Sequence, residues 1–193
     1  MRNFVYFSSQ ARTSGNFSLD NLMDAGRMDI AIHVIINAFF LSHNLREDVV
    51  LHLIFYGAPD PPKHIEIHID SNTSMSKKDV ANLIKKILYK YKPGVKTEAV
   101  PGCFIEKKSF LDVVNELAKE GKEIFVLDKK GENIRYIKIS KDSVFIIGDQ
   151  NGLPKKELKR MKKTAQFVSL GPRVYFASKV VTVINNELDL RGF

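Results

Sequence analysis

The sequence predicts an α/β fold, in which one domain spanning residues 1–193 contains a mainly parallel sheet flanked by helices. Three observations lead to this prediction. Strand and helix signals alternate along the chain. The strand segment Val49–Tyr56 is mostly apolar, as expected where both faces of a sheet are covered. The length suffices to bury one core, and the chain has no internal repeat and no long linker.

The first part of the chain predicts three strands and one helix. Phe4–Phe7 is an opening strand that runs into a polar loop. Residues Met28–Leu41 carry apolar side chains at the spacing of a helix face. Val49–Tyr56 is the next strand, and the run Gly57–Pro62, rich in glycine and proline, ends it sharply. Beyond this break, Ile65–Ile69 alternates apolar and polar residues, which predicts a half-exposed strand.

Two helices and one strand are predicted in the middle of the chain. A weak capping box that begins at Ser76 opens a helix extending to Tyr91. The same start signal at Ser109 opens a second helix, which ends at Gly121. Glu123–Leu127 has the character of a strand. The alternation of elements therefore continues through this part of the chain.

The last third of the chain has the clearest pattern. The apolar strand Val144–Ile147 precedes a short basic helix, Lys155–Met161. The short strand Gln166–Val168 comes next, and Val174–Leu188 has the length and periodicity of a closing helix. Strands that alternate with helices in this way favour parallel pairing within one sheet.

The chain is strongly basic, with a net charge of +8 and a pI near 9.5. Such a charge suits a polyanionic partner such as RNA. A lysine-rich surface with dense Lys/Glu pairs, as in heat-adapted proteins, would have the same composition. Composition alone leaves both interpretations open.

The sequence predicts neither a membrane segment nor a metal site. No apolar run reaches the ~18 residues that span a bilayer, and the N-terminus lacks the pattern of a signal peptide, so we expect a cytoplasmic protein. The single cysteine, Cys103, excludes an intramolecular disulfide. The five histidines lack the spacing of a structural zinc site. His33 and His52 lie in apolar segments and are predicted to be buried structural imidazoles.

Two apolar strands run directly into glycine-containing turns. The first turn begins at Gly148 and the second is Ser169-Leu170-Gly171. Ligands of open α/β sheets bind outside the carboxyl ends of strands, and glycine lets the backbone approach a flat ligand closely. Neither turn is GxGxxG or a phosphate-binding P-loop, which argues against a dinucleotide site. The alternative is that both glycines only allow tight turns.

Several motifs in the chain carry a family resemblance. They are RMD, H and AFFLS within residues 27–42, HLIFYGAPDPP at residues 52–62, GDQNG at residues 148–152, and SLGP, AS and NNELD within residues 169–189. Together they resemble the archaeal tRNA pseudouridine-54 N1-methyltransferases of the SPOUT class, over nearly the whole chain. The resemblance implies a C-terminal trefoil knot, although knots are a rare exception to the topology of ordinary folds. It also implies an obligate homodimer with each cofactor pocket near the subunit interface.

The resemblance further implies that the cofactor is S-adenosylmethionine, bound mainly through backbone hydrogen bonds between aliphatic walls. Carried over position by position, the contacts are Leu127, Gly148, Ser169, Leu170, Gly171 and the segment from Val174 to Val180. Members of the family often have His-Cys where this chain has Lys179-Val180. Contacts through the main chain would survive this difference, whereas any role of a thiol would not.

The chemistry implied by the resemblance is simple. N1 of pseudouridine must attack the sulfonium methyl group in line and lose its proton, so positioning and a nearby proton acceptor suffice. Asp29 is the candidate that orients the base or accepts the proton. The alternative is that Asp29 caps its helix or pairs with Arg27. Arg27 could instead contact a phosphate or a base oxygen.

Four basic residues are candidates for RNA binding. Arg12 lies in the polar loop after the first strand, and Arg173 follows the glycine turn at Gly171. Lys155 and Lys156 begin a dense basic run that phosphate groups could neutralise. The alternatives are a mobile surface loop around Arg12 and a solvated helix face for the lysines.

The predicted function is methyl transfer from S-adenosylmethionine to N1 of pseudouridine at position 54, in the T-loop of tRNA. A related enzyme of the same class that acts on pseudouridine of ribosomal RNA is the alternative nearest to it. A protein that binds S-adenosylmethionine or RNA without turnover is the alternative from a different class.

Overall fold

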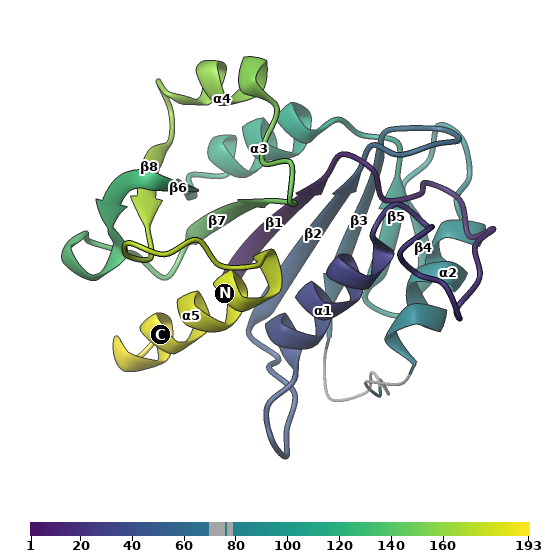
Figure 1. The fold of residues 1–193 in the computed structure, drawn as a ribbon, viewed down its shortest axis with the longest axis horizontal. Helices are drawn as coiled ribbons and strands as arrows, with labels where there is room; N and C mark the ends of the chain where they lie inside the picture. Colours follow the sequence, from purple (N-terminus) through teal and green to yellow (C-terminus); the bar gives the residue numbers. More distant parts are fainter. Residues whose placement is uncertain (70–75, 77–78) are drawn as a thin grey trace.

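The computed structural model describes residues 1–69, 76 and 79–193, and in this part of the chain eight strands form one sheet (Figure 1). The strands are β1 Arg2–Ser8, β2 Val49–Phe55, β3 Lys63–His68, β4 Thr97–Val100, β5 Cys103–Glu106, β6 Glu123–Asn133, β7 Ser143–Gly148 and β8 Gln166–Ser169. The helices are α1 Met28–Phe39, α2 Val80–Tyr89, α3 Phe110–Lys119, α4 Lys155–Met161 and α5 Ala177–Leu190, with a 3-10 turn, η1 Ile134–Tyr136.

The sheet has a parallel and an antiparallel half, in the order β4-β5-β3-β2-β1-β7-β6-β8. β1 pairs in parallel with β2 and β7, and β6 pairs in parallel with β7 and β8. β3, β5 and β4 add antiparallel pairs on the other side of β2. The predicted α/β class with a mainly parallel sheet is confirmed, and the antiparallel pair β4–β5 is an addition that the sequence pattern did not reveal.

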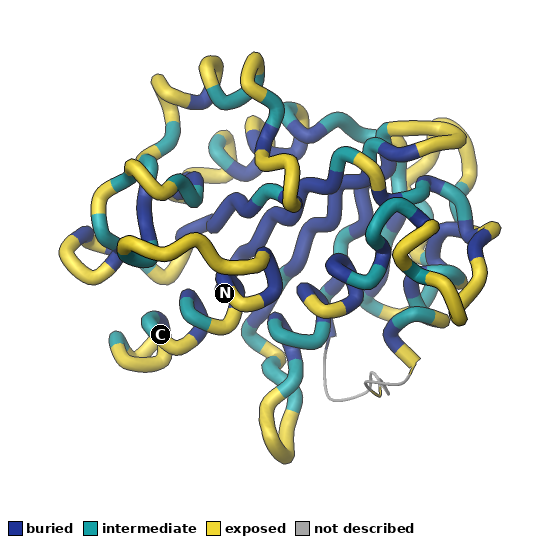
Figure 2. Tube along the Cα trace, viewed as in Figure 1, coloured by how far each residue is buried: buried dark blue, intermediate teal, exposed yellow. Residues whose placement is uncertain are grey.

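Helices cover both faces of the sheet (Figures 1 and 2). Residues of α1, α2 and α5 join the core on one face, and residues of α3 and α4 join the core on the other. Along β1, Phe4 and Tyr6 point to the first core while Val5 and Phe7 point to the second. This double burial explains the continuous apolar character of the central strands.

Arg2 connects the start of the sheet to the C-terminal helix. Its buried guanidinium donates hydrogen bonds to the Asn185 side chain at 3.1 Å, to Asp189 at 2.6 Å and to the carbonyl oxygen of Phe193 at 2.7 Å. Arg46 also donates to Asp189. Although burial opposes ionisation, Arg46 and Arg2 lower the pKa of Asp189 below its usual value. The NNELD motif thus has a structural role in fastening α5 to the sheet.

The proline-rich segment after β2 is held by charged groups. The Lys63 side chain is almost fully buried and donates to the carboxylate and the carbonyl oxygen of Asp60, each at 2.6 Å. Lys107 also donates to this carboxylate. Lys107 and then Lys63 lower the pKa of Asp60 to about 2. Gly57 lies against the carbonyl oxygen of Gln10, which an added Cβ would approach to 2.1 Å.

Two sequence predictions need correction. The closing helix begins at Ala177 and not at Val174, because residues 174–176 form an exposed stretch that leads into the helix. His33 is exposed, since it lies one residue beyond Ile32 and so about 100° away from the apolar face of α1. His52 is buried, as predicted.

Candidate functional site

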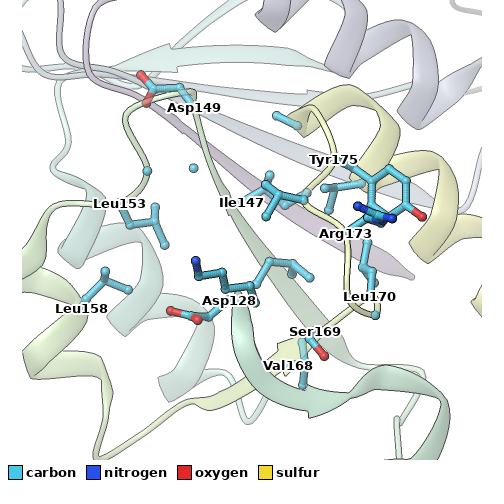
Figure 3. Close-up of a pocket in the computed structure, with 18 of the residues that line it drawn as sticks. Asp128, Ile147, Asp149, Leu153, Leu158, Val168, Ser169, Leu170, Arg173 and Tyr175 are labelled. Carbon is cyan, nitrogen blue, oxygen red and sulfur yellow. The ribbon is translucent and has the colours of Figure 1, made fainter.

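A cavity of about 350 Å³ lies at the carboxyl ends of β7 and β8 and beside the middle of β6 (Figure 3). Its volume is within the range of roughly 300–1,000 Å³ that is typical of small-molecule pockets. Most of the residues that the resemblance assigned to the cofactor line this one cavity, although they come from four segments of the chain. They include Leu127, Gly148, Ser169, Leu170, Gly171, Val174 and Val180. Phe176, Ser178 and Lys179 of the assigned segment do not line it.

The walls of the cavity are aliphatic and its rim is charged. Ile147 and Val168, at the ends of β7 and β8, point into the space from one side, and Leu153 faces it from the loop after β7 (Figure 3). Asp128 and Arg173 contribute opposite charges at the lining. Apolar walls around exposed backbone groups suit a flat heterocycle that is recognised by main-chain hydrogen bonds.

The two glycines singled out in the sequence have different local roles. An added Cβ on Gly148 would lie 2.7 Å from the backbone of Gly152, so the loop after β7 can fold back only over glycine. Gly171 has a φ of 116°, in the region that favours glycine, and an added Cβ there would meet nothing. Both glycines thus serve the shape of their turns, and this shape brings the backbone to the cavity.

Asp149 fixes the loop after β7, and the sequence analysis overlooked it as a site residue. The carboxylate is buried and accepts hydrogen bonds from the backbone N–H of Ser9 at 2.7 Å and from the Ser9 hydroxyl at 2.8 Å. The backbone N–H of Asn151 donates to its other oxygen at 2.8 Å. A carboxylate directly after a strand-end glycine was the available signal. Asp149 therefore joins the cavity to the end of β1.

Arg27 and Asp29 form a bidentate ion pair at the start of α1. Nε and Nη2 of Arg27 donate to the two carboxylate oxygens of Asp29, each at 3.0 Å. Arg27 has a φ of 62°, an uncommon conformation for a residue other than glycine. The hydrogen bond from Arg27 lowers the pKa of Asp29. The pair considered as an alternative in the sequence analysis is thus present, and Asp29 makes no side-chain cap to the helix.

Tyr6 lies within electrostatic range of both this ion pair and Asp149, which lines the cavity. Its ring is fully buried on β1, the strand that pairs directly with β7. Burial raises the pKa of its hydroxyl, and the negative charges of Asp149 and Asp29 raise it further. The phenol is therefore neutral, and both carboxylates are close enough to interact with it electrostatically.

The four predicted RNA-binding residues are placed differently. Lys155 and Arg173 line the cavity, whereas Lys156 and Arg12 do not. None of the four has an ion-pair partner in the part of the chain that the structure describes. The backbone of Arg12 donates to the carbonyl oxygen of Ala25 at 3.1 Å, which fixes its loop against a neighbouring segment.

A family model described as "Putative SAM-dependent RNA methyltransferase" matches residues 1–193. The chain belongs to this family. Among curated relatives, the tRNA (pseudouridine(54)-N(1))-methyltransferase of Methanococcoides burtonii is 37% identical, over 98% of this chain and 96% of the relative. The enzyme of the same name from Methanococcus aeolicus is 35% identical over 98% of each chain. The predicted family resemblance is therefore confirmed over the length of the chain.

The fold of this family member also matches a solved structure. The crystal structure of Archaeoglobus fulgidus Nep1 bound to S-adenosylhomocysteine aligns with a TM-score of 0.67, over 100% of this chain and 99% of that chain. The two sequences are 12% identical, so this likeness concerns the fold alone. It agrees with the predicted α/β class and extends across the whole sheet.

Proposed function

We propose that the protein transfers a methyl group from S-adenosylmethionine to N1 of pseudouridine 54 in the T-loop of tRNA. One observation carries the proposal: the ends of β7 and β8 and the middle of β6 form a cavity with aliphatic walls, in a chain whose full-length relatives are named for this reaction. The carboxyl ends of parallel strands are where α/β enzymes bind their ligands.

The cavity fits the proposed cofactor in size and chemistry. Backbone groups of Leu127, Gly148 and Leu170 would hold the adenosine part between the aliphatic walls. Carboxylates and cations both line the space, which matches the opposite charges of an amino-acid moiety. When bound, S-adenosylmethionine supplies a methyl group activated by a sulfonium. Because this activation resides in the cofactor, the proposed reaction assigns no role to a metal ion.

Asp29 is proposed to orient the base. Since Arg27 lowers its pKa, the carboxylate is ionised and is a weak proton acceptor. It would accept a hydrogen bond from the N1–H and so direct the nitrogen lone pair, while the proton leaves to water. Arg27 uses two of its five N–H donors on Asp29. The remaining donors are available for a base oxygen or a phosphate.

Arg12, Arg173, Lys155 and Lys156 are proposed to bind the RNA backbone. A cation without a protein partner binds phosphate without first breaking an ion pair, and each contact releases counterions from the nucleic acid. Lys155 and Arg173 would act next to the cofactor, because they line its cavity.

Among the described residues no helix is long and apolar enough to cross a membrane. We expect the enzyme to act in the cytoplasm.

A homodimer is proposed to complete the site. Val174 and Phe176 are 79% and 78% exposed, and Tyr175 between them is also exposed. These large apolar side chains follow the glycine turn, and Val174 and Tyr175 line the cavity itself. Adjacent exposed apolar residues of this size are typical of a surface that another protein covers. A second copy of the chain would bury them and close one side of the cofactor pocket.

A trefoil knot is proposed for the C-terminal part, within a single domain of residues 1–193. Arg191, just after α5, donates to the carbonyl oxygens of Ile134 and Ile137 at 2.8 and 2.9 Å. The tail is thereby fastened to the connection between β6 and β7. β6 also pairs with β8 on both sides of a register shift between Leu127 and Glu132, so the end of β6 that leads into this connection lies against the strand that precedes the tail.

The deciding experiment is methyl transfer to defined RNAs. A tRNA transcript with pseudouridine at position 54 should accept a methyl group, and mass spectrometry of its nucleosides should identify N1-methylpseudouridine. The same transcript with uridine at that position should not react. Methylation of ribosomal RNA alone would exclude the tRNA assignment. Cofactor binding without product on any RNA would show a binding module without turnover.

A further inference from the structure

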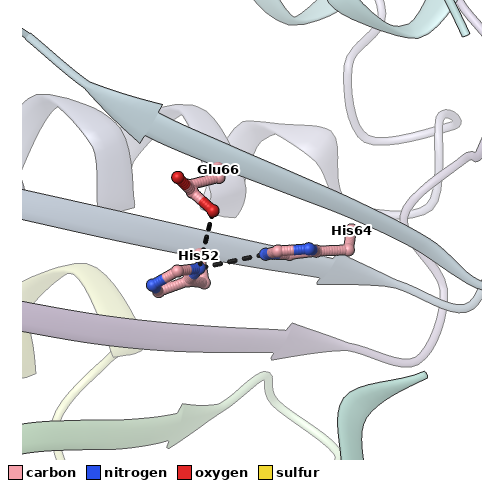
Figure 4. Close-up of side chains that lie close together, drawn as sticks. All are labelled: His52, His64 and Glu66. Carbon is pink, nitrogen blue, oxygen red and sulfur yellow. Dashed lines mark hydrogen bonds and ion pairs between the residues drawn. The ribbon is translucent and has the colours of Figure 1, made fainter. Parts of the chain in front are cut away.

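A cluster of potential metal ligands lies in the antiparallel half of the sheet, apart from the cavity (Figure 4). His52 on β2 and Glu66 on β3 are direct partners in the strand register, and His64 lies two residues before Glu66 on the same face. His52 Nδ1 is 3.0 Å from His64 Nε2 and 4.0 Å from Glu66 Oε2. One nitrogen or oxygen of each residue thus lies within 4.8 Å of the others.

A fourth residue fixes the orientation of His64. Its Nδ1 lies 3.0 Å from Oε1 of Glu106, within hydrogen-bond distance. Because an ionised carboxylate can only accept, the His64 proton is on Nδ1. In the neutral ring the lone pair is then on Nε2, which faces His52. A carboxylate behind a histidine is the arrangement that typically orients a metal-binding imidazole.

We propose that His52, His64 and Glu66 bind one divalent ion of the zinc class, with an open fourth position. Ligand atoms about 2.0–2.2 Å from a tetrahedral zinc ion lie about 3.3–3.6 Å apart. The observed separations of 3.0 and 4.0 Å bracket this value, so binding needs rotation of the side chains and a shift of the His52 proton from Nδ1 to Nε2. Two imidazoles and one carboxylate form a donor set that favours zinc over magnesium or calcium.

The sequence could not reveal this site. Along the sequence the nearest histidine to His64 on its own strand is His68, whereas the structure joins His64 to His52 on the neighbouring strand. The ring of His52 is almost fully buried, and its Nε2 has no hydrogen-bond partner in the described part of the chain. Glu66 is partly exposed, which gives an ion a path from solvent.

Lys96 competes with the proposed ion. Its ammonium group lies 2.8 Å from Oε2 of Glu66, the oxygen that faces His52. An ion must therefore share this carboxylate with a lysine that is partly exposed. Removal of the lysine charge would free the carboxylate, so a Lys96→Gln variant should bind the ion more tightly. If the ion were bound at another site, the loss of the Lys96 charge should not tighten its binding. Tighter binding by Lys96→Gln therefore identifies Glu66 as a ligand.

Metal titrations of the full-length protein, after treatment with a chelator, test the proposal. Wild type should bind one Co²⁺ or Zn²⁺ per chain, and Co²⁺ should give the intense visible absorption of a four-coordinate site. His64→Gln and Glu66→Gln should abolish this signal. Glu106→Gln keeps all three ligands and should weaken binding by about 10–100-fold, because the carboxylate behind His64 is lost. His43→Gln, at an exposed position outside the cluster, is the matched control.

Two results would overturn the proposal. One is the absence of stoichiometric Zn²⁺ or Co²⁺ binding at micromolar concentrations to the wild-type protein. The other is equal binding by wild type, Glu66→Gln and Lys96→Gln, which would place the metal elsewhere. Either outcome would leave His52, His64 and Glu106 as a hydrogen-bonded chain that joins β2, β3 and β5. Circular dichroism of each variant shows whether a loss of binding reflects a loss of fold.

Discussion

A carboxylate that already pairs with an arginine accepts a proton poorly. At the residue scale, the pairing of Asp29 with Arg27 allows two roles of Asp29 to be distinguished, namely orienting the base and accepting its proton. An orienting residue needs only an acceptor oxygen, which asparagine retains, whereas a proton acceptor needs the carboxylate. We therefore expect Asp29→Asn to lower kcat about tenfold and Asp29→Ala about 100-fold. Single-turnover rates on a T-loop transcript measure both, and equal losses in the two variants would favour the proton-acceptor role.

Asp60 should make stability depend on pH. Its pKa is about 2 in the folded chain and 3.8 in its ordinary state, so the folded state favours the ionised form. A depressed pKa contributes stability above pH 3.8 that is lost as the pH falls towards 2. Asp60→Asn should therefore be less stable than wild type at pH 7, and the difference should shrink as the pH approaches 2.

Urea denaturation at several pH values measures this difference. The matched control is Asp20→Asn, because Asp20 is exposed and its carboxylate has no ion pair among the described residues. A difference between Asp60→Asn and wild type that stays constant down to pH 2 would mean that Lys63 and Lys107 do not stabilise the ionised carboxylate.

At the scale of elements, one asparagine joins α5 to α1. Asn185 is buried, and its amide donates to the carbonyl oxygens of Asn37 and Ala38 at the end of α1, at 3.2 and 3.4 Å. It also accepts from Arg2. Asn185→Ala leaves these groups unpaired and should cost about 1–3 kcal/mol in the free energy of unfolding. The adjacent Asn186→Ala, at an exposed position, should change little, and equal losses would contradict the role of Asn185.

Elements with a strong pattern were predictable from the sequence and short mixed ones were not. Thr97–Val100 and Cys103–Glu106 are strands of four residues each, joined by a turn at Gly102. Neither is long enough to show alternation, and they become strands because β3 offers its free edge. Val174 was assigned to α5 because it continues the apolar period of the helix. In the structure it lines the cavity instead. The spacing of apolar residues along the sequence does not distinguish these two places.

The residues of the candidate site also divide into those that the sequence predicted and those that it did not. Gly148 and the turn Ser169-Leu170-Gly171 were predicted because strand-end turns form a local pattern, and the resemblance supplied Leu127 and the segment from Val174 to Val180. Asp149 and Tyr6 were not found, because their importance comes from neighbours that are distant in sequence. Asp149 accepts hydrogen bonds from Ser9, which lies 140 positions away. Contacts of this range depend on the topology of the sheet and leave no local signature.

At the scale of the whole molecule, the exposed apolar residues before α5 predict the oligomeric state. Phe176→Ser should shift the protein from dimer to monomer in analytical ultracentrifugation, because it removes a large apolar side chain from the proposed interface. Val95→Ser, at an exposed position before β4, is the control and should leave the dimer intact. A wild-type protein that is already monomeric at micromolar concentration would exclude the dimer.

The proposed knot predicts how the chain extends under force. If handles at Met1 and Phe193 pull a knotted chain, the knot tightens and does not untie. The unfolded contour should then be shorter than the full length of about 3.3–3.6 Å per residue. Optical-tweezers measurements give this length directly. Extension to the full length would show that the tail is not threaded.

The contact between Arg2 and Phe193 joins the second residue to the last one. All the residues that line the cavity lie between Leu127 and Val180, and the helix beyond them is fastened to the first strand. During synthesis β1 can pair early with β2, but its other partner, β7, and the helix α5 are made much later. The cavity is complete only in a chain that has been made as far as α5, so the proposed methyl donor has no site in a shorter fragment.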